Sequence, residues 1–218
     1  RDRCEALIMI APSLGMGRLR VLADEVPIVA VARPLSCPGV DIIRIDDQGG
    51  IGIAVDHLVG LGHRRIVHVD GGNAPSSSER RNGYLGAMEA HGLEEEAVVV
   101  PGGLEQVDGV QAAKAILAGG TLPTGITAFN DRLAFGIIQG LFMAGISVPE
   151  QGSVVGFDNA RRHDTSLVPL TTIDQNPSLM AQLALERAVG RAADRYLPTQ
   201  QVLVPRLVDR ASSGPASS

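Results

Sequence analysis

The sequence has few of the residues that build metal sites and disulfide scaffolds. Its two cysteines, Cys4 and Cys37, lie far apart and form no CxxC pair, which argues against a disulfide framework or a cysteine-based zinc site. The five histidines show no metal-ligand spacing with one another or with cysteine. We therefore expect two reduced thiols and no metal site.

Excess positive charge and long apolar runs are also missing. Lysine and arginine sum to 19 against 24 acidic residues, a formal net charge of −5, so the chain has no electrostatic attraction to phosphate backbones or anionic membranes. No stretch approaches the roughly 20 apolar residues of a membrane span, and the start at Arg1 lacks the apolar segment of a secretory signal. A free-standing nucleic-acid binder and a membrane protein are both disfavoured, and a cytoplasmic location is predicted.

The common catalytic motifs are absent as well. There is no GxGxxG after a strand, no GxxxxGK[ST], no GxSxG and no HExxH. The single lysine, Lys114, lies inside a helical stretch away from any strand end, so phosphate cradling and Schiff-base chemistry lack their usual residues. The sequence predicts no catalytic residue, no cofactor and no enzymatic activity.

What the chain does have is aliphatic residues in a regular alternation. Aromatics make up 3% and tryptophan is absent, so the core must be built from Val, Ile, Leu and Ala. Short β-branched runs alternate with longer segments of helical period, which is typical of βαβ units around a parallel sheet. Strands are expected at 6–11, 27–32, 42–45, 66–69, 97–100, 126–129, 154–157, 171–173 and 202–208, and helices at 17–24, 47–61, 78–90, 104–117, 131–144 and 177–196. The length allows one large domain or two lobes.

Polar residues follow these predicted strands. In parallel α/β folds, ligands bind beyond the carboxyl ends of the strands. A polyhydroxylated or otherwise hydrogen-bonding small molecule requires carboxylates, amides and an arginine that converge there. The residues of this kind are Arg33, Asp46, Asp47, Asp70, Asn130, Asp131, Asp158, Asn159, Asp174 and Gln175, with Arg80 opening the helix after Asp70.

Some of these residues have a structural alternative as helix caps. Asp47 and Asp131 stand directly before a helix, so capping is favoured over ligand contact for both. Asn130 and Asp158 directly follow an apolar strand, and ligand contact is favoured over capping. Arg80 is a cation that opposes the helix dipole, which favours a functional or salt-bridging role over a solvated charge.

Five segments resemble one known family. The DQGG segment at 47–50 and HLVGLGHRRIVHVDGG at 57–72 are similar to the lactose/galactose repressor (LacI/GalR) family of transcriptional regulators. SSSERRNGYLGAM at 76–88, TAFNDRLAFG at 127–136, and SVVGFDN at 153–159 with VPLTTIDQ at 168–175 resemble further motifs of that family. Each motif alone is loose, but their shared order and spacing over about 130 residues make the resemblance consistent.

The resemblance implies a two-lobed, periplasmic-binding-protein-like α/β fold with parallel sheets flanked by helices. The chain would cross between lobes near 45–47, near 175–177 and within about 197–207. The N-terminal lobe is expected to take residues 1–45 and 176–200, and the C-terminal lobe 46–175 and 201–210. The Ser/Gly/Pro segment 211–218 is expected to be a mobile tail.

The resemblance also implies that the N-terminal lobe is incomplete in this chain. Family members carry a helix-turn-helix headpiece, a hinge helix and the lobe's first strand and helix before the segment that corresponds to Cys4–Ala6. A lobe without its first strand would expose a sheet edge. We therefore expect this chain to be part of a longer protein.

By the same resemblance, the family's effector contacts are expected to fall on Arg80, Asn130, Asp158 and Gln175. A further contact is expected at Arg33 or, with the alignment shifted by one residue, at Ala32.

Stacking residues are largely missing from the implied site. Where family members place aromatic rings against a sugar or base, this sequence has Ile45, Gly102 or Gly103, and Pro177. The resemblance therefore predicts a sugar-like effector held by hydrogen bonds rather than a purine.

The predicted function is control of operator DNA affinity through a headpiece outside this chain, with the effector bound between two lobes. A homodimer is expected, with the helix face at 134–140 and the loop 161–163 as candidate interfaces; an ordinary amphipathic helix and a solvated loop are the alternatives. A periplasmic sugar-binding protein of a transporter is the first rival function, and a signal peptide upstream would favour it. An enzyme on the same fold is the second, and ligand turnover abolished by Asp158→Ala would favour that class.

Overall fold

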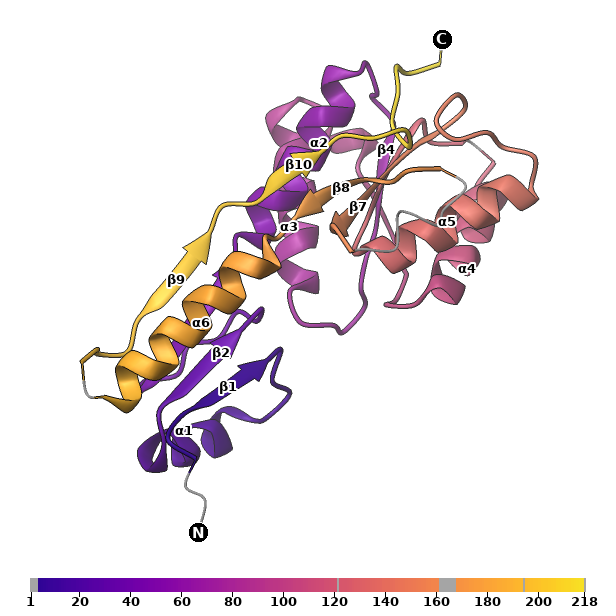
Figure 1. The fold of residues 1–218 in the computed structure, drawn as a ribbon. Coiled ribbons are helices and arrows are strands. Elements are labelled where there is room, and N and C mark those ends of the chain that lie inside the picture. Colours follow the sequence, from indigo (N-terminus) through magenta and orange to yellow (C-terminus); the bar gives the residue numbers. More distant parts are fainter. Residues whose placement is uncertain (1–3, 121, 161–167, 194, 218) are drawn as a thin grey trace. The chain divides into compact units, whose positions relative to one another are not determined.

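The chain folds into two compact units, each built from separate stretches of sequence. The structure is a computed structural model, which describes residues 4–120, 122–160, 168–193 and 195–217. Unit 1 comprises Arg1–Asp46 and Asn176–Val204, and unit 2 comprises Asp47–Gln175 and Pro205–Ser218. The chain therefore passes from one unit to the other after residues 46, 175 and 204 (Figure 1).

Unit 1 is a parallel sheet with a helix on each face. Its strands are β1 (Leu7–Ile10), β2 (Ile28–Val31), β3 (Val40–Ile45) and β9 (Gln200–Leu203), hydrogen-bonded in that order. Alternate residues of β2 point to opposite faces: Ile28 packs with α1 (Met16–Glu25), and Val29 packs with α6 (Pro177–Ala192). Both faces of β2 are covered, which explains why its sequence is an uninterrupted apolar run.

A buried carboxylate joins the elements of unit 1. Asp41 in β3 is fully buried, and its Oδ1 lies 2.6 Å from Arg187 Nη2 while its Oδ2 lies 3.0 Å from Arg191 Nη1. Both arginines project from α6, and the backbone N–H of Thr199 also donates to Asp41. A buried charge of this kind is tolerated only because it is paired and hydrogen-bonded.

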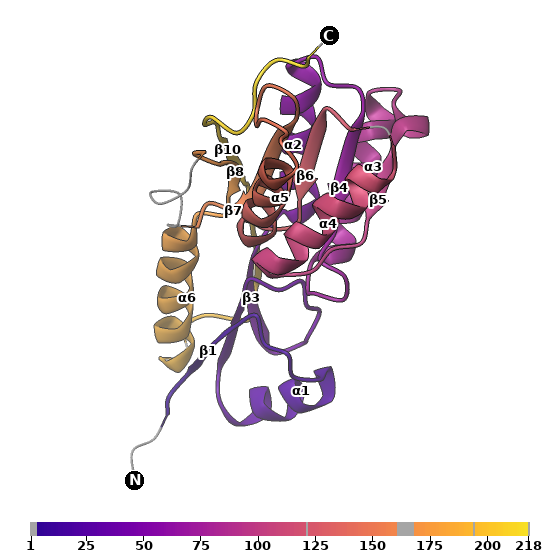
Figure 2. The ribbon, with the colours of Figure 1, turned by 90° about the vertical axis from the view of Figure 1, so that its right-hand side faces the viewer.

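Unit 2 is a six-stranded sheet in the order β10 (Arg206–Val208), β8 (Thr171–Asp174), β7 (Ser153–Asp158), β6 (Gly125–Ala128), β4 (Ile66–Val69) and β5 (Val98–Val100). All pairings are parallel except that of β10 with β8. Helices α2 (Asp47–Gly60) and α3 (Ser77–Ala90) pack together, as do α4 (Gln106–Ala118) and α5 (Asp131–Met143), and a 3₁₀ turn η1 spans Glu94–Glu96. The two helix pairs cover the sheet (Figure 2).

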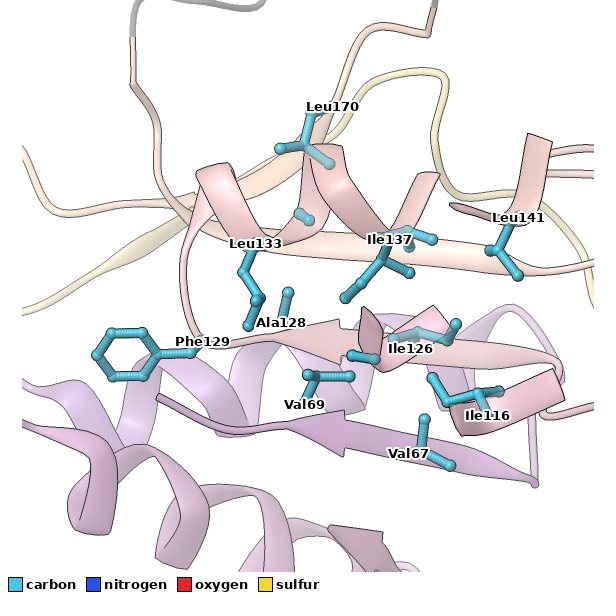
Figure 3. Packing of buried hydrophobic residues seen from close by; sticks show 13 residues of the cluster. Val67, Val69, Ile116, Ile126, Ala128, Phe129, Leu133, Ile137, Leu141 and Leu170 are labelled. Atoms are coloured by element: carbon cyan, nitrogen blue, oxygen red, sulfur yellow. The ribbon is translucent and has the colours of Figure 1, made fainter. Parts of the chain in front are cut away.

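The main core of unit 2 lies between the sheet and the pair α4 and α5 (Figure 3). Valine, isoleucine and alanine side chains from β4 and β6 meet leucines and isoleucines of the two helices; the labelled members are Val67, Val69, Ile116, Ile126, Ala128, Phe129, Leu133, Ile137, Leu141 and Leu170. The helices approach closely because they cross at glycines. A Cβ at Gly136 would lie 1.9 Å from the carbonyl oxygen of Gln106, so no larger residue fits without movement.

Most expected strands and helices are present, but the closing strand expected at 202–208 is two strands. β9 pairs parallel with β3 in unit 1, and β10 pairs antiparallel with β8 in unit 2. Between them stand Val204 and Pro205, where the chain leaves unit 1. Proline has no N–H to continue a ladder. The expected lobe boundary at residue 200 therefore moves to 204, because residues 201–203 complete the sheet of unit 1.

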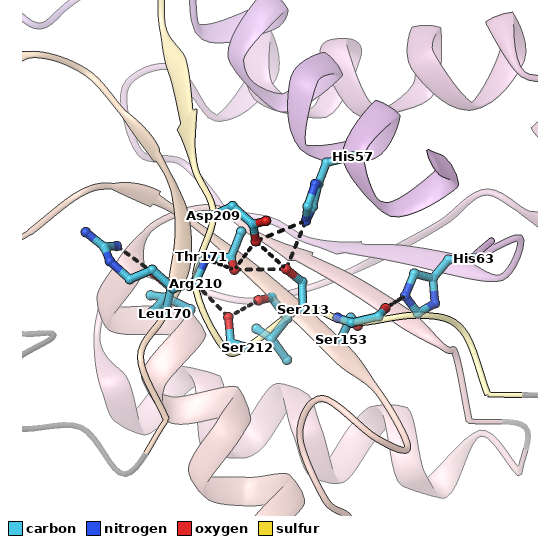
Figure 4. A network of polar contacts seen from close by, with 11 residues as sticks. His57, His63, Ser153, Leu170, Thr171, Asp209, Arg210, Ser212 and Ser213 are labelled. Carbon is cyan, nitrogen blue, oxygen red and sulfur yellow. Dashed lines mark hydrogen bonds and ion pairs between the residues drawn. The ribbon is translucent and has the colours of Figure 1, made fainter. Parts of the chain in front are cut away.

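The expectation of an unpacked tail from residue 211 is wrong for the described residues 211–217. Ser212 is fully buried; its Oγ donates to the carbonyl of Val154 at 2.6 Å and accepts from the N–H of Thr171 at 2.8 Å (Figure 4). Further along, Ala216 N–H donates to the carbonyl of Leu61. Composition suggested a loose tail, but a short hydroxyl side chain can satisfy the backbone groups of two strands at once.

Candidate functional site

Arg80 occupies the centre of the polar residues at the carboxyl ends of the unit 2 strands. It is the fourth residue of α3 and is 5% exposed. Its Nε donates to Asp47 Oδ1 at 2.8 Å, its Nη1 donates to the carbonyl of Phe129, and Nη1 lies 3.8 Å from Asp158 Oδ1. The predicted salt-bridging role of Arg80 is therefore confirmed.

Two aromatic rings flank the Arg80 guanidinium. Its central carbon lies 4.5 Å from the ring centroid of Phe129 and 3.6 Å from that of Phe157, distances at which a ring face attracts a cation. Two glycines make room for the rings. A Cβ at Gly71 would lie 2.7 Å from the ring of Phe129, and a Cβ at Gly50 would lie 2.7 Å from the ring of Phe157. Both rings therefore lie within cation–π distance of the guanidinium and restrict its position.

Asp47 does not cap a helix as the sequence suggested. It is the first residue of α2 and is buried, and its Oδ2 accepts from Ser76 Oγ at 2.9 Å while Oδ1 binds Arg80. Helices α2 and α3 approach so closely that a Cβ at Gly83 would lie 2.2 Å from the carbonyl oxygen of Gln48. This contact places the start of α2 beside Arg80, and Asp47 becomes its ion-pair partner.

The cap of α5 is Asn130, where the sequence favoured Asp131. Asn130 Oδ1 accepts from the N–H of Leu133 at 2.8 Å, and its Nδ2 donates to the carbonyl of Leu104. Asn130 is thus a structural residue first, and ligand contact by it stays a prediction. An amide oxygen satisfies the free N–H groups of a helix start as well as a carboxylate does.

Asp131 has a different role. Its Oδ1 accepts from Thr172 Oγ1 at 2.5 Å and its Oδ2 from the N–H of Ala160 at 2.7 Å, which fixes the segment after β7 against β8. Burial raises the pKa of Asp131 to about 7, although both hydrogen bonds act in the opposite direction.

Asp158 and Gln175 meet at the ends of β7 and β8. Gln175 Nε2 donates to Asp158 Oδ1, and the Asp158 side chain is 37% exposed. Burial raises the pKa of Asp158, and the positive charge of Arg80 opposes that rise. Asp158 has φ 124°, a conformation that L-residues rarely adopt and that is often found at ligand sites.

The structure brings three of the five predicted contacts into one cluster. Asp158 contacts both Arg80 and Gln175, and Asn130 follows Phe129, whose carbonyl accepts from Arg80. Arg33 lies in unit 1, where its Nη1 donates to the carbonyl of Pro12 and links the loops after β1 and β2. Its competitor Ala32 has φ 59°.

Sequence reasoning missed the two rings and the role of Asp47. Phe129 and Phe157 are two of only four phenylalanines, and each stands one residue before a predicted ligand contact. That position at the end of a strand was a usable signal. The expectation that stacking is scarce concerned the ligand, whereas these rings stack on Arg80.

Another polar group has the composition of a hydrolase triad without its geometry. His57 Nε2 lies 2.9 Å from Ser213 Oγ and 3.8 Å from Asp209 Oδ1 (Figure 4). A triad requires the two imidazole nitrogens to face different partners, and here one nitrogen faces both. This network fastens residues 209–213 to α2 and β8, and we assign it no catalytic role.

Metal binding and membrane insertion find no support in the part of the chain that the structure describes. No group of three or more His, Cys, Asp or Glu residues there could hold a metal ion. None of the described helices is both long enough and apolar enough to span a bilayer.

Comparisons with known proteins agree with this fold. The family model of the periplasmic binding protein-like domain matches residues 55–213. A LacI transcriptional regulator from a Rhodococcus species has a similar structure, with a TM-score of 0.94 and 42% identity over 99% of this chain and 80% of that one. A LacI family regulator from Enterococcus faecium, solved with bound ribose, has a TM-score of 0.89 and 26% identity, covering 98% and 80% of the two chains.

A curated relative gives the same result. The regulator GalR of Escherichia coli is 33% identical over 97% of this chain and 63% of its own length. The chain spans 59 to 63% of the length of the first curated relatives it matches.

The fold and the family model define a periplasmic binding protein-like domain. The matches in sequence and structure to regulators narrow this class. The chain belongs to the LacI/GalR family of transcriptional regulators.

Proposed function

We propose that this chain is the effector-binding and dimerisation part of a transcriptional regulator that binds a small sugar-like molecule. The observation that carries the proposal is the geometry around Arg80. The guanidinium is fixed by Asp47 and two rings, yet its Nη2 makes no hydrogen bond to any described residue. A fixed donor beside the partly exposed Asp158 is suited to bind a ligand.

The cluster matches the chemistry of a polyol. Arg80 Nη2 can donate to a ligand oxygen, and Asp158 and the Oε1 of Gln175 can accept from ligand hydroxyls. Asn130 uses its Oδ1 for the cap and one Nδ2 hydrogen for Leu104, so one hydrogen remains for a ligand. The ribose bound by the Enterococcus faecium relative supports a sugar as the ligand class. Arg33 stays a proposed ligand contact.

The proposed mechanism is a shift of population. A ligand that binds one conformation of the chain more tightly favours that conformation, and the change alters the affinity of a separate DNA-binding headpiece for operator DNA. Such a regulator acts in the cytoplasm. The resemblance of this chain to regulators supports this function over that of a transporter's binding protein or an enzyme.

A homodimer is part of the proposal, but the surface differs from the expected one. Ala134 and Ile137 are buried in the core of unit 2, so most of the face at 134–140 is already covered, and residues 161–163 lie outside the described residues. Phe142 and Met143 at the end of α5 are each 68% exposed. We propose that they contribute to the dimer contact, and Phe142→Glu should then lower the mass measured by sedimentation equilibrium.

A thermal-shift screen against sugars, sugar phosphates, polyols and nucleosides tests the proposed ligand class. A ligand that binds the folded state raises the melting temperature by mass action, and a rise with one sugar class is the expected result. Asp158→Ala should then weaken the binding of that ligand by about 1.5 to 3 kcal/mol, the range for a hydrogen bond to a charged group. Asp56→Ala, which removes an exposed carboxylate paired with His91, is the matched control. Unchanged affinity in the Asp158 variant would refute the site.

A further inference from the structure

Arg80 is neutralised within the chain before any ligand binds. Its guanidinium contacts two carboxylates, Asp47 at 2.8 Å and Asp158 at 3.8 Å. The Asp47 side chain is 4% exposed and that of Arg80 6%, so water screens this pair little. The buried cation therefore offers hydrogen-bond donors without a surplus of positive charge.

Three other arginines near this edge of unit 2 are paired with carboxylates as well, whereas Arg210 donates to the amide oxygen of Asn159 at 2.8 Å. Among the described residues of that edge, Arg81 pairs with Asp70, Arg132 with Glu105 at 2.8 Å, and Arg206 with Asp174 at 2.9 Å. These three pairs add no surplus of positive charge beside Arg80, and Asp158 is an additional carboxylate.

The Asp47–Arg80 pair is held so that it cannot easily open for an anion. Ser76 donates to the second oxygen of Asp47, and the close contact of Gly83 with Gln48 fixes α3 against α2. Phe129 and Phe157 both lie within cation–π distance of the guanidinium and restrict its movement. A ligand phosphate would have to compete with a carboxylate that is already in place.

An anionic group and a hydroxyl group would experience this cluster differently. A phosphate at Arg80 Nη2 would be attracted by one charge and repelled by two nearby carboxylates, at distances where such interactions are large in a partly buried site. A hydroxyl can accept from Nη2 and donate to Asp158, and because it is uncharged the two carboxylates do not repel it. The arrangement is complementary to an uncharged polyol.

We infer that Asp47 is a specificity-determining residue: by neutralising Arg80 it makes the site select uncharged polyhydroxyl ligands and reject their phosphorylated analogues. The inference rests on the proposed function, because it places the ligand at Arg80. Asp47 acts through Arg80 and is a positioning residue, not a ligand contact.

Calorimetric titration of the 218-residue chain tests the inference with matched pairs of compounds: ribose and ribose 5-phosphate, galactose and galactose 1-phosphate, glucose and glucose 6-phosphate, and fructose and fructose 6-phosphate. The neutral member of the pair that binds should bind roughly tenfold or more tightly than its phosphate. In Asp47→Asn, which is isosteric, this preference should shrink by roughly tenfold or more, and the variant should gain binding of inorganic phosphate.

Asp70→Asn is the matched control. It makes the same change in net charge at the same edge but frees Arg81 instead of Arg80. The preference should stay within about threefold of the wild-type value, because the freed Arg81 side chain is 41% exposed and water screens its charge. Equal shifts in the two variants would show a general charge effect and overturn the inference.

The outcomes separate the inference from the proposed function. A wild-type chain that binds a sugar phosphate more tightly than its neutral sugar overturns the inference and leaves the function standing. If no sugar of either kind binds, the proposed function fails, but the titration with inorganic phosphate still tests the inference. Binding of inorganic phosphate that appears only in Asp47→Asn supports neutralisation of Arg80 by Asp47. No phosphate binding in that variant overturns the inference. Should Asp47→Asn not fold, the wild-type comparison decides, with Asp47→Glu expected to keep the preference.

Discussion

Acid should destabilise this chain through one buried histidine. His68 in β4 is fully buried; its Nδ1 lies 3.1 Å from Thr127 Oγ1, and its ring stacks on Tyr84 with centroids 5.5 Å apart. Its Nε2 is buried without a hydrogen-bond partner among the described residues. Burial lowers the pKa of His68 from 6.5 to about 4, and the nearby Arg80 and Arg81 act in the same direction.

The size of the effect follows from proton linkage. Between pH 6.5 and about 4 the unfolded chain binds a proton at this histidine and the folded chain does not, so the free energy of unfolding falls as the pH falls. Since one pKa unit corresponds to about 1.4 kcal/mol, His68 should remove about 3 kcal/mol of stability when the pH drops from 7 to 4. That is a large share of the free energy of unfolding of an ordinary domain, which is roughly 5 to 15 kcal/mol.

The buried carboxyl of Asp131 opposes this trend. Its pKa is raised from 3.8 to about 7, so the folded chain keeps a proton that the unfolded chain has lost, and stability from this group falls as the pH rises from about 4 to 7. The two contributions overlap in pH and differ in sign. The stability profile of the wild-type chain alone therefore cannot reveal either of them.

The decisive measurement is the difference between two profiles. Urea unfolding of the wild-type chain and of His68→Leu at pH 7, 5.5 and 4 gives the free energy of unfolding of each, and both chains retain Asp131. His68→Leu should lose about 3 kcal/mol less than the wild-type chain on acidification. Asp131→Asn should show the opposite difference. Parallel profiles for wild type and His68→Leu would refute the argument.

Three further changes test the packing. Gly136→Ala should destabilise unit 2 by about 2 to 4 kcal/mol in thermal or urea unfolding, because the added Cβ meets the backbone of α4. Gly86→Ala in α3, which has open space around it, is the control and should be neutral or stabilising by about 0.5 to 1 kcal/mol. Equal effects of the two changes would contradict the close helix crossing. Ser212→Ala should cost about 1 to 3 kcal/mol by leaving two buried backbone groups unpaired, and no loss would mean that the C-terminal segment does not pack as described. Asp41→Ala should cost about 3 to 5 kcal/mol and change the unfolding of unit 1 first, and an unchanged melting curve would argue against the buried ion pairs.

The candidate site could be predicted from the sequence only as far as strand ends are visible. Asp158 and Gln175 follow apolar runs, and parallel strands bring such residues to one edge whatever the details of packing. The roles of Asp47 and Asn130 were not visible in this way. Both stand at a strand-to-helix turn, where a cap and an ion pair look alike until the neighbouring helix is placed.

The tail shows the same limit for composition. Residues 211–217 are rich in serine, with glycine and proline, which is the composition of a flexible linker. The hydroxyl of Ser212 nevertheless lies between β7 and β8, and its neighbours Asp209 and Ser213 meet His57, which is more than 150 residues away in the sequence. A contact over such a separation leaves no local pattern.

The sequence by itself determined the fold class and the order of the elements, because apolar period and turn residues act locally along the chain. It also determined the chemistry available at the strand ends, since side-chain types need no structure to identify. Only the tertiary structure decided which carboxylate faces Arg80, which side chain caps α5 and where the chain leaves unit 1. Those outcomes depend on the close approach of helices at Gly83 and Gly136 and on pairing between distant strands, which local patterns do not encode.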